Sequence, residues 1–136
     1  MNENKPSALI VGGSSGLGLE LAIMLSSTYH VVVTGRRDPK NEKLDFRVLD
    51  LSARNQFAGN LDDFVAGLPK VDLFIYAAGF YQEGNISDVS DEDVVDMTNV
   101  GLLAPAMLLQ RLLKKQDKLP GFIAVTSTSQ WTPRLL

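Results

Sequence analysis

The residues best suited to chemistry in this 136-residue chain are a run of glycines and serines near its amino terminus. The run reads Val11-Gly12-Gly13-Ser14-Ser15-Gly16-Leu17-Gly18 and follows a short apolar stretch. Such glycines let the backbone turn sharply and approach a pyrophosphate, and a helix that begins there offers N–H groups to the anion. The hydroxyls of Ser14 and Ser15 are further donors. We predict a dinucleotide-phosphate loop over residues 12–18, called the glycine loop below. The alternative is a turn that only joins a strand to a helix.

The next apolar stretch ends at Gly35-Arg36-Arg37, where the kind of dinucleotide is decided. In sites for NAD an acidic residue usually stands at this point and contacts the ribose 2′-hydroxyl. This chain has Gly35 there and Arg36 beside it, and an arginine pairs with a 2′-phosphate through charge-assisted hydrogen bonds. We therefore predict that NADP(H) is preferred over NAD(H), with Arg36 and Arg37 as its phosphate ligands. The alternative is that both arginines are solvated charges in a turn.

Strands and helices that alternate along the chain would position these residues. Apolar runs typical of strands buried on both faces occupy residues 8–11, 31–34, 73–76 and 122–126, and a more polar strand covers 46–49. Helical patterns follow the glycine loop, cover 57–68 and extend from Asp91 to Lys115. We predict an α/β fold of the Rossmann type, a doubly wound parallel sheet in three αβα layers with about five strands in the order 3-2-1-4-5. One dinucleotide-binding domain covers residues 1–136.

The composition excludes several classes of protein and site. The chain carries 13 Lys and Arg against 16 Asp and Glu, a net charge of −3, so nucleic acid and anionic lipid are not expected partners. It has no cysteine and one histidine, His30, so no metal site is predicted. No run is long or apolar enough for a secretion signal or a membrane span, and we expect a cytoplasmic protein.

In their order along the chain, these motifs resemble the short-chain dehydrogenase/reductase (SDR) family. The resemblance rests on the glycine loop, Gly35-Arg36-Arg37, Asp50-Leu51, Ala77-Ala78-Gly79 and Ser127-Thr128. It implies hydride transfer between NADP(H) and a small-molecule carbonyl or alcohol, with Asp50 in contact with the adenine. The family's Asn-Asn-Ala-Gly segment reads Tyr76-Ala77-Ala78-Gly79 here, so only its backbone role carries over. The expected cofactor-binding residues are Gly12, Ser14, Ser15, Gly16, Leu17, Gly18, Arg36, Arg37, Asp50, Leu51, Ala77, Ala78 and Gly79.

The resemblance also implies catalytic residues. The serine that polarises the substrate oxygen is assigned to Ser127, with Thr128 as second candidate, although hydroxyls at a strand end can also cap a turn. The nearest candidate for the family's helix asparagine is Asn99, and a different register places that position at Gly101.

The family's acid/base pair, a tyrosine with a lysine four residues later, has no counterpart in these 136 residues. The three tyrosines stand at positions 29, 76 and 81, and none has such a lysine. We therefore expect the C-terminally truncated portion of a longer oxidoreductase, inactive by itself. The alternative is a non-catalytic NADP(H)-binding sensor or regulatory module. An open apolar strand at 122–126 also predicts a homo-oligomer, formed through that strand or through the helix Asp91–Lys115.

Overall fold

The computed structural model describes residues 5–52, 56–79 and 85–126. Its centre is a parallel sheet of five strands, which are β1 (Ser7–Val11), β2 (His30–Gly35), β3 (Leu44–Val48), β4 (Leu73–Tyr76) and β5 (Gly121–Ala124). The strands lie in the order β3-β2-β1-β4-β5, and every neighbouring pair is parallel. This confirms the predicted doubly wound α/β fold and its strand order.

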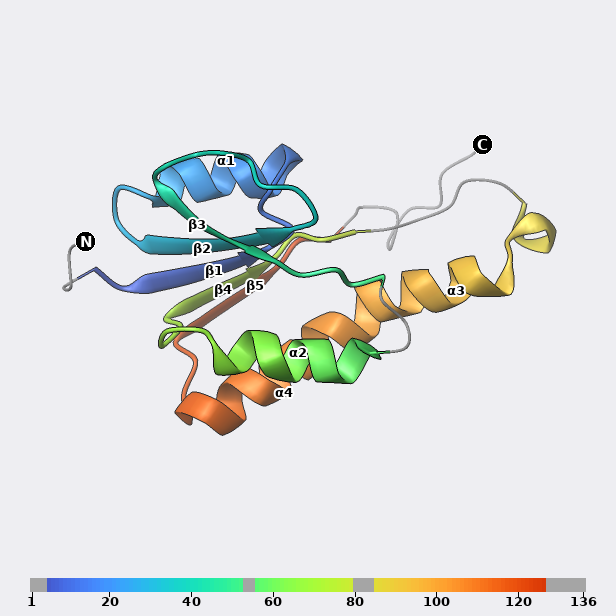
Figure 1. Cartoon of the computed structure of the whole chain (residues 1–136). Helices are drawn as coiled ribbons and strands as arrows, with labels where there is room; N and C mark the ends of the chain where they lie inside the picture. The colour runs from blue at the N-terminus through green and yellow to red at the C-terminus, as the bar shows by residue number, and fades with distance from the viewer. Residues whose placement is uncertain (1–4, 53–55, 80–84, 127–136) are drawn as a thin grey trace.

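Helices cover both faces of the sheet and make the fold three-layered (Figure 1). Helix α1 (Gly16–Leu25) lies on one face, and α2 (Phe57–Ala66) and α4 (Ala104–Gln116) lie on the other. Helix α3 (Asp91–Thr98) extends beyond the carboxyl ends of the strands, after a short 3-10 turn η2 (Ile86–Asp88). In the described part of the chain, no helix combines the length and the apolar character that crossing a membrane requires.

Alternate residues of each central strand pack on opposite faces, which is why the strand sequences are continuously apolar. In β1, Leu9 and Val11 belong to the cluster beneath α2 and α4, whereas Ala8 and Ile10 belong to the cluster beneath α1. The first cluster is completed by the buried helical side chains of Leu61, Val65, Leu108 and Leu112. The sheet is therefore anchored from both sides, and its carboxyl ends form a fixed edge.

The helical segment predicted from Asp91 to Lys115 begins and ends as expected and contains one turn of a different helix type. At its start the Ser90 hydroxyl accepts a hydrogen bond of 3.1 Å from the Asp93 amide, as a capping serine does. At its end the Lys115 ammonium donates to backbone carbonyls at the end of α2, including Val65 at 2.9 Å. Between these ends, one π-helical turn, η3 (Asn99–Leu103), separates α3 from α4. The helical backbone therefore widens by one π-turn between α3 and α4.

Candidate functional site

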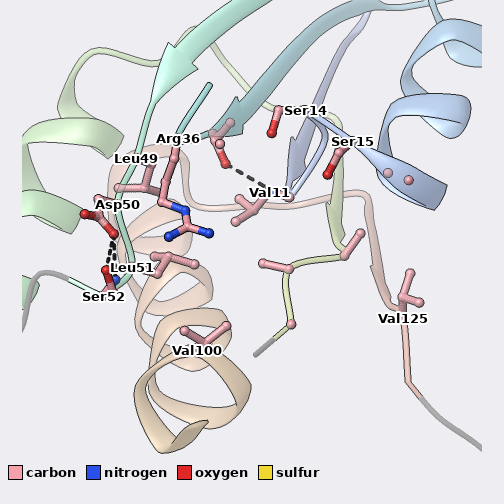
Figure 2. Close-up of a pocket in the computed structure, with 18 of the residues that line it drawn as sticks. Val11, Ser14, Ser15, Arg36, Leu49, Asp50, Leu51, Ser52, Val100 and Val125 are labelled. Atoms are coloured by element: carbon pink, nitrogen blue, oxygen red, sulfur yellow. Dashed lines mark hydrogen bonds between the residues drawn. The ribbon is translucent and has the colours of Figure 1, made fainter. Parts of the chain in front are cut away.

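A cavity of about 640 Å³ opens at the carboxyl ends of the strands. Its walls come from the glycine loop, the end of β2, and the segments after β3 and β4, with contributions from α3, η3 and Val125 (Figure 2). The strand order reverses between β1 and β4, and ligands of open α/β sheets bind outside the carboxyl ends at such a switch point. The position of the cavity alone therefore points to a binding site.

Close backbone contacts hold the glycine loop against the sheet. Gly12 has a φ of 85°, and a Cβ on it would lie 2.5 Å from the Ala78 amide nitrogen. A Cβ on Gly18 would lie 2.1 Å from the Gly12 carbonyl oxygen, so α1 begins directly against the loop. The Gly13 amide donates to the Thr34 carbonyl at 3.0 Å. These contacts place the amino terminus of α1, with its positive dipole end, at the cavity.

Arg36 and Asp50 line the cavity where the chain leaves β2 and β3 (Figure 2). Asp50 Oδ1 accepts hydrogen bonds from the Ser52 hydroxyl at 2.6 Å and from the Ser52 amide at 2.9 Å. These two bonds, the hydroxyl first, lower the pKa of Asp50 below its usual value; slight burial opposes them and the charge of Arg36 assists them. The site therefore presents an ionised carboxylate beside a guanidinium.

The predicted cofactor-binding residues come together at this cavity, with one exception. Arg37 is exposed and does not line it, although its neighbour Arg36 does. The predicted residues that line the cavity are Gly12, Ser14, Ser15, Gly16, Leu17, Gly18, Arg36, Asp50, Leu51, Ala77, Ala78 and Gly79.

Of the predicted catalytic residues, the structure describes only Asn99, which does not line the cavity. Asn99 is buried in η3 but is not among the lining residues, and Gly101, the other register, is exposed and does not line it either. Ser127 and Thr128 lie outside the described residues. Val125, two residues before Ser127, does line the cavity, so the chain leaves β5 at its wall.

Sequence reasoning missed several lining residues, notably Asp96, Val100 and Ser52. Asp96 and Val100 are four residues apart, the spacing of neighbours on one side of a helix, and both are buried. Ser52 could have been found from its position two residues after Asp50, because an aspartate in a turn commonly accepts hydrogen bonds from the amide and hydroxyl of the residue two positions later. These residues add a second carboxylate and an apolar wall to the site.

Tyr76, the last residue of β4, contacts the π-helical turn next to the cavity. Its hydroxyl donates to the backbone carbonyl of Val100 in η3, and its side chain is 4% exposed. Burial raises the pKa of this phenol above its usual value. Tyr76 therefore stays neutral at physiological pH and joins β4 to the π-helical turn.

The sequence model of the family described as short chain dehydrogenase matches residues 6–131. The chain belongs to the short chain dehydrogenase family. Members of this family are oxidoreductases, and the match extends over the glycine loop, the Arg36 turn and the segment after β4. A search of curated proteins found no match.

Solved structures agree with the fold of this family member. A short-chain dehydrogenase from Streptomyces avermitilis superposes with a TM-score of 0.80 at 21% identity, covering 95% of this chain and 52% of that one. One from Leptospira borgpetersenii, solved with bound NAD+, gives 0.80 at 21% identity, covering 97% and 55%. An actinorhodin polyketide ketoreductase variant with NADPH gives 0.82 at 20% identity, covering 97% and 57%. This chain therefore spans little more than half the length of these structures.

Proposed function

We propose that this chain is the dinucleotide-binding portion of an NADP(H)-dependent short-chain oxidoreductase acting on a small-molecule carbonyl or alcohol. The observation that carries the proposal is the cavity at the switch point, in which the glycine loop and the amino terminus of α1 face Arg36. A fixed row of backbone amides and a guanidinium suit a ligand with phosphates at two places. Solved structures with this fold include one described with bound NAD+ and three described with bound NADP or NADPH.

The residues that line the cavity fit the parts of such a cofactor. The glycine loop, closed by the tight contacts of Gly12 and Gly18, would hold the pyrophosphate. Asp50 and Leu51 would receive the adenine, and Arg36 would pair with the 2′-phosphate. NADP(H), when bound, supplies or accepts the hydride; these residues bind and orient it.

The cofactor preference is tested by calorimetric titration of the 136-residue chain with NADPH and NADH. We expect tighter binding of NADPH and a loss of roughly 10- to 150-fold in NADPH affinity on Arg36→Ala, the range for a charge-assisted bond. The affinity for NADH should change little, because NADH lacks the 2′-phosphate. Arg37→Ala is the matched control, since it removes the same charge from the neighbouring position outside the cavity.

Two results would contradict the preference. Equal or tighter binding of NADH by the unaltered chain would remove the case for NADP(H). Equal losses in Arg36→Ala and Arg37→Ala would mean that general charge, rather than a placed guanidinium, attracts the cofactor.

We also propose that the 136-residue chain binds the cofactor without turning it over. Tyr76 is buried and bonded to Val100, and Tyr29 packs against the cluster beneath α1, at the strand ends remote from the cavity. Neither can protonate a substrate in the site, and the third tyrosine, Tyr81, lies outside the described residues and has no lysine four residues later. Ser127 or Thr128 remains assigned to the substrate oxygen and Asn99 to a supporting role. NADPH oxidation above blank with any member of a carbonyl panel would overturn this proposal. Binding without turnover is also what the alternative, a sensor module, would show.

A further inference from the structure

At Gly35, the last residue of β2, a side chain is excluded by lack of space and not by a backbone conformation that only glycine adopts. Among the described residues, positive φ glycines are Gly12 and Gly16, so the backbone at position 35 is open to any residue type. A Cβ built on Gly35, however, would lie 1.9 Å from the Ser14 hydroxyl oxygen and 2.5 Å from the Ser14 Cβ. Rotation of the serine would move its hydroxyl away but would leave its Cβ in place. Ser14 thus fills the volume in which a side chain at position 35 would begin.

Neither side of this contact is free to withdraw. On the strand side, Gly35 pairs with Val48 of β3, and its carbonyl accepts from the Leu49 amide at 3.2 Å. On the loop side, the amides of Gly12 and Gly13 donate to the hydroxyl and the carbonyl of Thr34, at 3.3 and 3.0 Å. The residues on either side of the Ser14–Gly35 contact are therefore hydrogen-bonded to their neighbours, and relief by a backbone shift would break these bonds.

We propose that Ser14 acts as a steric block at position 35 and so is a specificity-determining residue for the cofactor. An acidic side chain at the end of β2 is what favours the free 2′-hydroxyl of NAD(H) and repels a 2′-phosphate. In this chain the block excludes that side chain, and Arg36 is left as the charged neighbour of the 2′-position. The inference rests on the proposed NADP(H) preference and adds to it a coupled pair of positions, one in the glycine loop and one in β2.

The pair predicts that an acid at position 35 has its effect only when position 14 is also changed. Gly35→Asp alone should weaken both cofactors, because the new Cβ displaces the glycine loop. The double variant Ser14→Gly with Gly35→Asp removes the blocking Cβ and should bind NADH about 10-fold more tightly than Gly35→Asp alone, a coupling typical of residues in contact. It should also bind NADPH more weakly than Ser14→Gly alone, because the carboxylate repels the 2′-phosphate.

The experiment is a double-mutant cycle on the 136-residue chain, read by calorimetric titration with NADH and NADPH and by urea unfolding without cofactor. The unfolding cycle uses Gly35→Ala, which adds the Cβ with no charge. Gly35→Ala should lower the unfolding midpoint, and Ser14→Gly should remove most of that loss. Ser15→Gly is the control, since it alters the next residue of the same loop but does not touch position 35.

The outcomes separate the block from the proposed function. If Gly35→Asp alone raises NADH affinity as much as the double variant does, the steric block is wrong. The block is also wrong if Ser15→Gly restores the unfolding midpoint of Gly35→Ala as well as Ser14→Gly does. A third contradicting result is that neither Gly35→Asp nor the double variant folds. If the unaltered chain prefers NADH, or binds neither cofactor, the proposed preference fails, and the block loses its role in specificity even where the unfolding cycle shows the coupling.

Discussion

At the scale of single residues, Ser52 fixes the orientation of the Asp50 carboxylate that lines the cavity. Both of its donors bond the same carboxylate oxygen, Oδ1, and hold the carboxylate in one orientation. Because these bonds favour the charged form, the pKa of Asp50 is lowered. Ser52→Ala removes the hydroxyl and should move that pKa back toward the usual aspartate value of about 3.9. A carbon-13 NMR titration of the Asp50 carboxyl measures the change.

The sign of the matching stability effect follows from the direction of the shift. A carboxylate whose pKa is lower in the folded state stabilises the fold above the unfolded pKa, and the contribution disappears as the pH falls through the folded value. Ser52→Ala should therefore lose stability at neutral pH but not in strong acid. Ser52→Thr retains the hydroxyl and is the rescuing control. An unchanged Asp50 titration in Ser52→Ala would contradict the assigned cause of the shift.

The same contact predicts how the adenine is recognised. If Asp50 accepts the adenine amino group, a cofactor with hypoxanthine in place of adenine offers a carbonyl there and should bind more weakly. We expect Ser52→Ala to reduce that discrimination by about 3- to 10-fold, the worth of one hydrogen bond. Competitive titrations with the two cofactors measure it. Equal discrimination in Ser52→Ala and the unaltered chain would show that Asp50 needs no support from Ser52.

At the scale of elements, Tyr76 ties β4 to the π-helical turn η3. Tyr76→Phe leaves the buried Val100 carbonyl without this donor and should lower the free energy of unfolding by about 1–3 kcal/mol. Burial raises the pKa of the phenol, so the folded protein retains a proton that the unfolded chain loses above about pH 10. Stability should therefore fall as the pH rises past that point, and Tyr76→Phe should lack this part of the fall. Urea unfolding at about pH 8 and about pH 11 tests both effects.

Tyr29→Phe is the matched control for Tyr76→Phe, because it also removes a tyrosine hydroxyl but leaves the Tyr76–Val100 hydrogen bond intact. Tyr29→Phe removes a phenol from the opposite face of the sheet, where its ring packs beneath α1. It should leave amide exchange in Asn99–Leu103 unchanged, whereas Tyr76→Phe should speed it. Similar exchange in both variants would mean that the turn does not depend on this bond.

The elements differ in how far the sequence could predict them. β4 was predicted at Leu73–Tyr76 because a strand that is buried on both faces consists of consecutive apolar residues. The π-helical turn could not be predicted in this way, because its carbonyl meets a tyrosine 24 positions earlier and nothing local marks it. The same holds for the site: glycine spacing revealed the loop, but Asp96 enters the cavity only because α3 and η3 pass the sheet edge. Arg37 was predicted to bind the cofactor because it follows Arg36 in the sequence, but in the turn after β2 only Arg36 lines the cavity.

At the scale of the whole molecule, the two edges of the sheet are protected differently. β3 lies at one edge, and its Asp45 and Arg47 form an ion pair of 3.1 Å. Charged side chains of this kind discourage pairing with another chain. β5 lies at the other edge and consists of Gly121-Phe122-Ile123-Ala124, with no charge and with Ile123 51% exposed. In the part of the chain that the structure describes, no strand pairs with the outer side of β5.

We therefore propose that two copies of the 136-residue chain associate through β5. Ile123→Lys places a charge on this edge, like the charges of β3, and should shift sedimentation at high concentration toward the monomer. Leu113→Lys is the matched control, because Leu113 is a similarly exposed apolar residue, 46% exposed, on α4. Dissociation by Leu113→Lys and not by Ile123→Lys would move the contact to the helix. If the unaltered chain sediments as a monomer, association through β5 and association through the helix are both wrong. The four-residue strand β5 would then be too short to pair with a second copy despite its apolar sequence.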